Sequence, residues 1–464
     1  MIFPDLRCDA KVGAEEGRAE FCDKFFPCII FIAEFTFAKV AVKAGFVFRP
    51  VGQFMQNGRV ISLFIRESFK VRHLQEVGAG CVIGAAAAVS DIRACRLDKP
   101  VGCLHALFGL TPTSVREYVR HGHQVIVETN AGVGIQASDD DYIKAGGKIV
   151  ATAKDVFDKA DMIVKVKEPQ AVECKMLRTG QILFTYLHLA ADAAQATGLI
   201  DSGAIAIAYE TVTSDRGGLP LLAPMSEVAG RMGVHIGAYH LQAPNGGSGI
   251  LIGGVPGVKA AEVVVLGGGV AGTHAAKMAV GMEARVTILE KSLDRIRQLE
   301  DLFGAKANVI YSTHDSVEQY VSAADLVIGA VLVPGALAPK LITRDLLKQM
   351  RPKSVIVDIA IDQGGCAETS KATTHDNPTF VVDNVVHYCV ANMPGAVPRT
   401  SAYALNNAVL PYGLEIADKG WVKALQDNKH LRNGLTVCKG KITQPEVAHD
   451  LKLSYTKAEE SLAA

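Results

Sequence analysis

Residues 109–464 alternate short apolar runs with polar or amphipathic stretches of helical length. Five apolar runs in the first part of this region are typical of buried strands: QVIVET, KIVA, DMIVKVK, ILFTYLH and AIAIAYE. Six more follow between residues 262 and 386: EVVVLG, RVTILE, NVIYS, DLVIGAV, SVIVDIA and FVVDNVV. Because strands that alternate with helices pair in parallel, this order predicts an α/β protein with two doubly wound, Rossmann-like domains and a cleft between them.

The run from Glu262 to Lys277, EVVVLGGGVAGTHAAK, predicts a strand, a glycine-rich turn and a helix. Gly267, Gly269 and Gly272 have the G-x-G-x-x-G spacing, which lets the backbone turn tightly, approach a pyrophosphate and pack the helix against the strand. The next strand ends at Glu290, eighteen residues after Gly272. A carboxylate there accepts hydrogen bonds from ribose hydroxyls and disfavours a 2′-phosphate. The segment therefore predicts a site for NAD rather than NADP.

Helix signals set the expected domain boundaries. Thr111 and Pro112 are the expected cap and first residue of a helix in GLTPTSVREYVRHG. The helical stretches MSEVAGRMGVHIGAYHL and ALNNAVLPYGLEIADKGW are expected to cross between the domains. We therefore assign residues 109–225 plus 395–464 to a substrate domain, which carries catalysis, and residues 226–394 to an NAD-binding domain.

The composition of the chain changes near residue 108. The first 70 residues contain 12 of the 17 phenylalanines, and six of the ten cysteines lie before Gly109. Charged residues interrupt the apolar run KFFPCIIFIAEFTFAKVAVKAGFVFRPV, which argues against a membrane span. The segment 1–108 shows no coherent order of elements, so we expect an atypical extension that is poorly ordered or wrongly deduced. An independent N-terminal domain is the alternative.

Charge and cysteine spacing narrow the function further. The chain has 48 Lys plus Arg and 48 Asp plus Glu, with no long block of one sign, so neither a nucleic-acid surface nor a polybasic membrane patch is expected. From residue 109 onward, no apolar run reaches the roughly 20 residues that cross a bilayer, and we expect a cytoplasmic protein with a small-molecule partner. The four cysteines there lack metal-ligand spacing and are expected to be free buried thiols: Cys174, Cys366, Cys389 and Cys438.

Polar residues close three of the predicted strands, where side chains face the expected cleft. Lys167 closes DMIVKVK and is a candidate for holding a carboxylate or carbonyl group, with a surface lysine as the alternative. His188 closes ILFTYLH and is a candidate general acid and base, with a structural histidine as the alternative. Asp362 follows SVIVDIAI beside two glycines and is a candidate for activating water, whereas Asp358 inside that strand is interpreted as a structural acid.

From Gly109 almost to the C-terminus, the chain resembles the NAD-dependent L-alanine dehydrogenase family, which is related to the α subunit of NAD(P) transhydrogenase. The resemblance rests on ordered blocks that include GLTPTSVREYVRHGH, QILFTYLHLA, LPLLAPMSEVAGR, LGGGVAGTHAAKMA, VIVDIAIDQGGCAET and HYCVANMPGAVPRTSAYALNNAVLPY. It implies oxidative deamination of L-alanine to pyruvate and ammonia with NAD, reversible as reductive amination. A homohexamer is implied as well, and no metal.

The same resemblance implies site residues. Lys167 binds the substrate, Asp362 activates the water that attacks the imine, and His188 transfers the proton as pyruvate forms. Beside the three glycines, the residues at positions that contact the cofactor in relatives are Ser226, Val270, Ala271, Glu290, Arg295, Ser312, Val331, Leu332, Ile359, Asp362, Asn392 and Met393. For the apolar members of this set, ordinary packing at strand ends is the alternative explanation.

One position departs from the family pattern. The family has an arginine two residues before the block that aligns with GLTP, and this arginine holds the substrate carboxylate, whereas this chain has Leu107. A lost charge-assisted hydrogen bond costs roughly 1.5–3 kcal/mol. Two other functions therefore stay open: a transhydrogenase-like NAD-binding subunit, against which Lys167, His188 and Asp362 argue, and a catalytically impaired NAD-binding protein.

Overall fold

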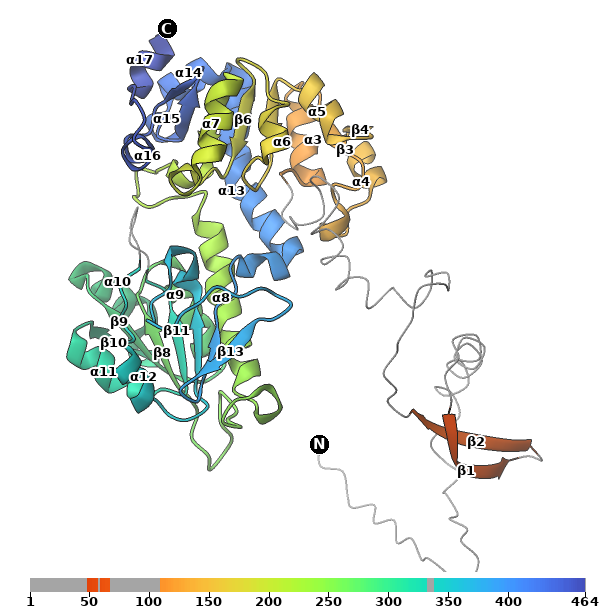
Figure 1. The fold of residues 1–464 in the computed structure, drawn as a ribbon, viewed down its shortest axis with the longest axis vertical. Helices are drawn as coiled ribbons and strands as arrows, with labels where there is room; N and C mark the ends of the chain where they lie inside the picture. The colour runs from red at the N-terminus through yellow and green to blue at the C-terminus, as the bar shows by residue number, and fades with distance from the viewer. Residues whose placement is uncertain (1–47, 57–58, 67–108, 332–337, 464) are drawn as a thin grey trace, which may run out of the picture. The chain divides into compact units, whose positions relative to one another are not determined.

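The computed structural model describes residues 48–56, 59–66, 109–331 and 338–463 (Figure 1). The chain divides into two units, Met1–Ser90 and Asp91–Ala464. In the first unit, β1 (Phe48–Gln56) pairs with β2 (Arg59–Arg66) in antiparallel orientation. The rest of segment 1–108 lies outside the described residues, so our expectation for that segment stays a prediction.

A seven-stranded sheet forms the centre of the glycine-rich half of the second unit. Its strand order is β10-β9-β8-β11-β12-β14-β13, and all neighbours are parallel except β13 and β14. The strands are β8 (Glu262–Leu266), β9 (Arg285–Glu290), β10 (Ala307–Tyr311), β11 (Leu326–Gly329), β12 (Val355–Asp358), β13 (Thr379–Val382) and β14 (Val385–Tyr388). The central strands β11 and β12 are buried along their whole length, which explains their continuous apolar runs.

Helices connect the strands of this sheet. They are α9 (Val270–Gly281), α10 (Leu293–Phe303), α11 (His314–Ser322) and α12 (Arg344–Gln349), with short 3-10 turns η5 (Gly304–Lys306), η6 (Ile359–Gln363) and η7 (Met393–Ala396). The strand order reverses between β8 and β11, because β9 and β10 extend the sheet on one side and β11 and β12 on the other. Doubly wound sheets bind their ligands at such a reversal.

The prediction that FVVDNVV forms one strand was wrong. The run forms the hairpin β13–β14, in which Val382 pairs with Val385 in antiparallel orientation. Asp383 and Asn384 form the two-residue turn, with φ of 46° and 65°. Asp and Asn tolerate the left-handed conformation that such a turn requires, and this signal within the apolar run was missed.

The other half of the unit contains a five-stranded sheet of order β16-β15-β7-β6-β5. Strands β5 (Met162–Val164), β6 (Ile182–Thr185) and β7 (Ile205–Ala208) are parallel, as expected, whereas β15 (Leu435–Cys438) and β16 (Lys441–Ile442) add an antiparallel edge. The first two predicted strands, β3 (Ile126–Glu128) and β4 (Lys148–Val150), pair in a separate parallel sheet. The C-terminal strands β15 and β16 were not predicted.

The other helices of this half are short: α3 (Pro112–Arg120), α4 (Asp139–Lys144), α5 (Ala153–Lys159), α6 (Ala171–Cys174), α7 (Ala193–Ser202), α14 (Trp421–Asp427), α15 (Lys429–Arg432), α16 (Pro445–Leu451) and α17 (Ala458–Ala463), with 3-10 turns η1 (Val133–Ile135), η2 (Leu189–Ala191) and η3 (Tyr209–Thr211). The predicted start of α3 is confirmed, because Pro112 is its first residue and the Thr111 side chain accepts a hydrogen bond from the Ser114 amide. The four cysteines of the described residues are buried free thiols.

Two long helices lie where the sequence predicted domain crossings: α8 (Ala223–His240) and α13 (Pro398–Lys419) (Figure 1). Helix α8 follows the five-stranded sheet along the chain and packs on α9 and β12 of the seven-stranded sheet. A side chain at Gly230 would lie 2.1 Å from the Ala271 carbonyl oxygen, so a glycine is needed for this close packing. Helix α13 packs on both α8 and α3. None of the described helices has the length and apolar character needed to span a membrane.

Candidate active site

The glycine-rich turn lies at the reversal of strand order, directly after β8. Gly267 has a φ of +93°, and a side chain at Gly272 would lie 1.8 Å from the Gly267 carbonyl oxygen. Gly269 is the N-cap of α9 and faces open space, and among the described residues no side chain caps this helix. Uncapped amides at a helix N-terminus bind anions, so the turn fits the pyrophosphate of a dinucleotide.

Glu290 and Arg295 are built into this turn. The Glu290 carboxylate, at the end of β9, accepts hydrogen bonds from the amides of Gly268 (2.8 Å), Lys291 (2.7 Å) and Ser292 (2.9 Å). Arg295 donates to the Gly268 carbonyl oxygen and to the Thr273 hydroxyl, both at 2.8 Å. These contacts fix a carboxylate and a guanidinium at the glycine-rich turn.

Several other predicted cofactor residues surround the same edge of the sheet. The Ser312 amide donates to the Glu290 carbonyl oxygen at 2.9 Å, and Val331 follows β11 beside Gly267. Val270 and Ala271 open α9, and Ile359 opens η6.

The remaining predicted cofactor residues are Ser226, Asn392, Met393 and Leu332. Ser226 lies in the first turn of α8. Asn392 precedes η7 with a φ of 61°. The Met393 side chain is 2% exposed and belongs to the core, so packing accounts for this side chain. Leu332 lies outside the described residues.

His188 lies at the carboxyl end of β6, between two glutamates from the neighbouring parallel strands. Its Nδ1 lies 2.6 Å from an oxygen of Glu168, which follows β5, and its backbone amide donates to Glu210, which follows β7, at 2.6 Å. The His188 side chain is 49% exposed and its ring stacks on Tyr186. The residue has a φ of 48°, in the left-handed region that costs a non-glycine residue roughly 1–2 kcal/mol. The surrounding contacts therefore hold a strained conformation.

Charged groups from both sheets act on one another at this position. Partial desolvation by the surrounding protein raises the pKa of Asp362 above its ordinary value, and the charges of Lys167 and His188 act in the opposite direction. Desolvation also opposes ionisation of Glu168, but its hydrogen bond from His188 and the charge of Lys167 outweigh this effect and lower the pKa of Glu168 to about 2. Lys167, His188 and Asp362, which the sequence analysis named, are therefore brought together.

Comparison with known proteins now assigns the chain to a family. The models of the N-terminal and C-terminal domains of alanine dehydrogenase/PNT match residues 107–229 and 233–445. The chain is 57% identical over 349 residues to alanine dehydrogenase from Halomonas elongata, an alignment that covers 75% of this chain and 94% of that protein. This chain belongs to the alanine dehydrogenase/PNT family.

Solved structures agree with this family assignment. A structure of L-alanine dehydrogenase, 49% identical, superposes with a TM-score of 0.74 and covers 76% of this chain and 98% of that one. A transhydrogenase from Sinorhizobium meliloti, 23% identical, has a TM-score of 0.65 and covers 74% and 98% of the two chains. The second likeness shows the shared fold alone.

Within this family fold, Asp358 has the surroundings of a structural acid. It is fully buried at the end of β12, and its carboxylate accepts hydrogen bonds from the amides of Ala360 (3.1 Å) and Cys366 (2.8 Å) and from the Ser370 hydroxyl (2.5 Å). These bonds fix the loop that carries Asp362. The interpretation of Asp358 as structural and Asp362 as reactive remains a prediction, which this geometry supports.

Sequence reasoning missed the two glutamates around His188. Both follow parallel strands, Glu168 directly after Lys167 and Glu210 in η3 after β7. The rule that pointed to Lys167 and His188 applies equally to them, because the carboxyl ends of parallel strands meet at one edge of a sheet. Within the described ranges, no group of three or more His, Cys, Asp or Glu side chains is arranged to hold a metal.

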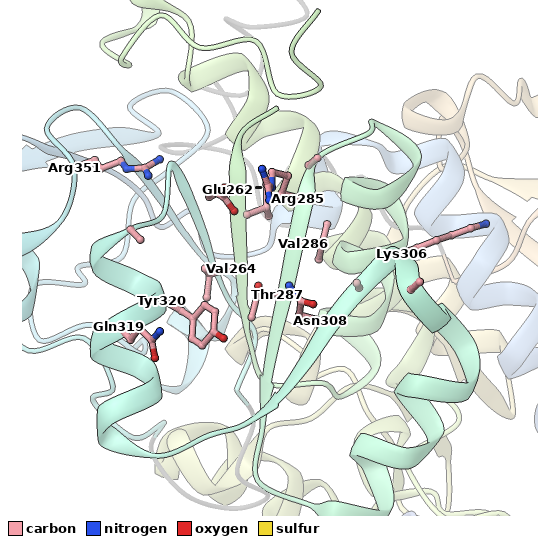
Figure 2. A pocket seen from close by; sticks show the side chains of 15 residues that line it. Glu262, Val264, Arg285, Val286, Thr287, Lys306, Asn308, Gln319, Tyr320 and Arg351 are labelled. Atoms are coloured by element: carbon pink, nitrogen blue, oxygen red, sulfur yellow. Dashed lines mark ion pairs between the residues drawn. The ribbon is translucent and has the colours of Figure 1, made fainter. Parts of the chain in front are cut away.

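The hollow in Figure 2 lies away from this site. It is lined by the first residues of β8, β9 and β10, including Glu262 and Arg285, whose side chains form an ion pair at 3.4 Å. The glycine-rich turn follows the opposite end of β8. The hollow therefore does not belong to the cofactor site.

Proposed function

We propose that this chain is an L-alanine dehydrogenase, which converts L-alanine to pyruvate and ammonia with NAD and also runs in reverse. The observation that carries the proposal is the placement of Lys167, His188 and Asp362 close enough for their charges to act on one another. This cluster occurs in a chain that is 57% identical to an alanine dehydrogenase. A homohexamer in the cytoplasm completes the proposal by family resemblance.

The glycine-rich turn is the proposed binding site of NAD. When bound, NAD accepts a hydride from Cα of alanine. The uncapped amides at the start of α9 would hold the pyrophosphate, and the absent side chain at Gly269 leaves room for its approach. The Glu290 carboxylate would accept hydrogen bonds from the ribose hydroxyls and would disfavour the 2′-phosphate of NADP.

The chain's own residues bind the substrate and move its protons. The Lys167 ammonium holds the carboxylate or carbonyl oxygen of the substrate. Asp362 accepts a proton from the water that attacks the iminium carbon, which yields a carbinolamine, and passes this proton to the carbinolamine nitrogen. His188 takes the hydroxyl proton of this carbinolamine as its C–N bond breaks, so ammonia leaves and pyruvate remains. In the reverse direction, the same groups return these protons.

The deciding experiment measures NADH formation by the purified full chain with L-alanine as the only other substrate. We expect turnover that depends on L-alanine, with L-glutamate and L-leucine much poorer, because a site for alanine has to accommodate only a methyl side chain. Hydride exchange only with a second nucleotide-binding protein would support a transhydrogenase-like subunit instead. NAD binding without turnover would support the impaired protein that Leu107 suggests.

A further inference from the structure

His188 has a backbone conformation that few residues other than glycine adopt, with φ 48° and ψ 37°. The carboxylate of Glu210 holds the backbone at this point. It accepts hydrogen bonds from the His188 amide at 2.6 Å and from the Leu187 amide at 3.1 Å. Two consecutive amides on one carboxylate fix the direction in which the chain leaves β6, and with it the direction of the imidazole.

The imidazole ring has its own partner. Nδ1 of His188 lies 2.6 Å from Oε1 of Glu168. An ionised carboxylate only accepts, so Nδ1 is the donor and Nε2 is left as the atom that gains and loses a proton. Tyr186 supports the ring from one face, stacked at 5.6 Å, and its own hydroxyl donates to the Leu221 carbonyl oxygen at 2.6 Å.

From these contacts we infer that Glu210 and Glu168 are positioning residues for His188: Glu210 fixes its backbone and Glu168 fixes its ring and tautomer. The inference rests on the proposed function, because it assigns His188 a proton to transfer. It goes beyond that function because it names the groups that orient the His188 ring and keep Nε2 free to gain and lose a proton. Neither glutamate is required to touch the substrate.

The charges around His188 agree with this inference. The groups that act on its imidazole are Glu168 after β5, Glu210 after β7 and Lys167 beside Glu168, and His188 in turn acts on Asp362 in η6. Desolvation lowers the pKa of His188, but the hydrogen bond to Glu168 and the negative charges of Glu210 and Glu168 outweigh it, so the net shift is upward. Removing either carboxylate should therefore move the pKa of His188 down.

The test compares Glu210→Gln and Glu168→Gln with the unchanged full chain. The His188 pKa is measured by NMR on protein with ¹³C-labelled histidine rings, and the His188 signal is assigned by its loss in His188→Asn. In both variants we expect a lower His188 pKa and a fall in kcat for L-alanine on the order of 10- to 100-fold, because a small misplacement of a reacting group costs about this much. KM for NAD should stay unchanged.

The chain contains a matched control for the backbone contact. Asn130 also has a left-handed backbone, with φ 62°, and its amide donates to the Asp139 carboxylate at 2.8 Å. Asp139 is not among the charged groups that act on His188. Asp139→Asn should therefore leave both the His188 pKa and kcat unchanged.

The possible results separate the inference from the proposed function. An unchanged His188 pKa together with unchanged kcat in both glutamate variants would overturn the inference. Equal losses in Asp139→Asn would also overturn it, because the effect would then be general. Glu168→Gln keeps the test valid if Glu210→Gln does not fold, because Glu168 holds only the ring of His188. The NMR measurement does not depend on turnover, so an inactive unchanged chain would contradict the proposed function and still leave this inference testable.

Discussion

The cofactor turn and the His188 cluster are built in opposite ways. The turn is made by the backbone: three glycines with fixed spacing bring β8 and α9 together, and a side chain at Gly272 would lie 1.8 Å from a carbonyl oxygen. The cluster is made by side chains from separate strand ends, with His188 between Glu168 and Glu210. Where the backbone packs this closely, as at Gly272, a site tolerates no added side chain, whereas a site made by charged side chains depends on which charges are present.

The largest expected effect is the loss of kcat when Asp362, which acts together with His188, is replaced. Asp362→Asn removes the group proposed to accept a proton from water, so kcat for L-alanine should fall by about 10²–10⁴-fold, the usual contribution of general acid–base catalysis. NAD affinity should change little, because the turn is intact. Steady-state kinetics with varied NAD check this, and a variant with unchanged kcat would exclude Asp362 from the reaction.

The second prediction concerns Leu107, which stands where the family has an arginine and lies outside the described residues. If the substrate carboxylate lacks an arginine there, Leu107→Arg should raise kcat/KM for L-alanine by about 10- to 150-fold, equal to one charge-assisted hydrogen bond. Leu107→Lys is the matched control, because it adds the charge without the bidentate geometry of arginine. Equal kinetics in all three proteins would show that position 107 does not contact the substrate.

A third prediction tests the close packing of the glycine-rich turn by adding a methyl group at Gly272 or at Gly269. Gly272→Ala should lower the free energy of unfolding by about 1–3 kcal/mol, because its Cβ overlaps the Gly267 carbonyl oxygen. Gly269→Ala should leave stability nearly unchanged, since nothing lies within 4 Å of its Cβ, while NAD binding weakens. Urea unfolding and NAD titration of both variants measure the two effects. Similar stability losses in both variants would contradict a turn fixed by close packing at Gly272.

The smallest effect concerns pH. The pKa of Glu168 is lowered to about 2 in the folded protein, so its ionised form stabilises the fold above the ordinary value of 4.5, and this contribution is lost as the pH falls toward 2. Glu168→Gln should therefore lower the free energy of unfolding at neutral pH by about 1 kcal/mol. The difference should shrink below pH 4.5. A difference that is independent of pH would show that packing, not charge, is responsible.

The same contrast explains what the sequence could and could not predict. Gly267, Gly269, Gly272 and Glu290 are recognisable because backbone geometry imposes a fixed spacing within one β-α-β unit. Glu168 and Glu210 were missed because their meeting at His188 depends on the order β7-β6-β5, which no local spacing encodes.

Local sequence patterns also failed to predict the antiparallel strands. Strands β15 and β16 were not predicted, and the hairpin β13–β14 was taken as one strand because the Asp383–Asn384 turn interrupts an otherwise continuous apolar run. The central parallel strands β8, β11 and β12, by contrast, were predicted because both of their faces are apolar. Local patterns therefore identified the parallel strands better than the antiparallel ones.

The most direct test of the account measures kcat and KM for NAD in His188→Ala and Glu290→Ala side by side with the unchanged chain. We predict that His188→Ala loses about 10²–10⁴-fold in kcat with KM for NAD nearly unchanged. Glu290→Ala should show the reverse: a raised KM for NAD, weaker discrimination against NADP, and a kcat at saturation that holds. Normal turnover in His188→Ala, or unaltered NAD affinity in Glu290→Ala, would contradict the division between a proton-transfer cluster and a cofactor turn.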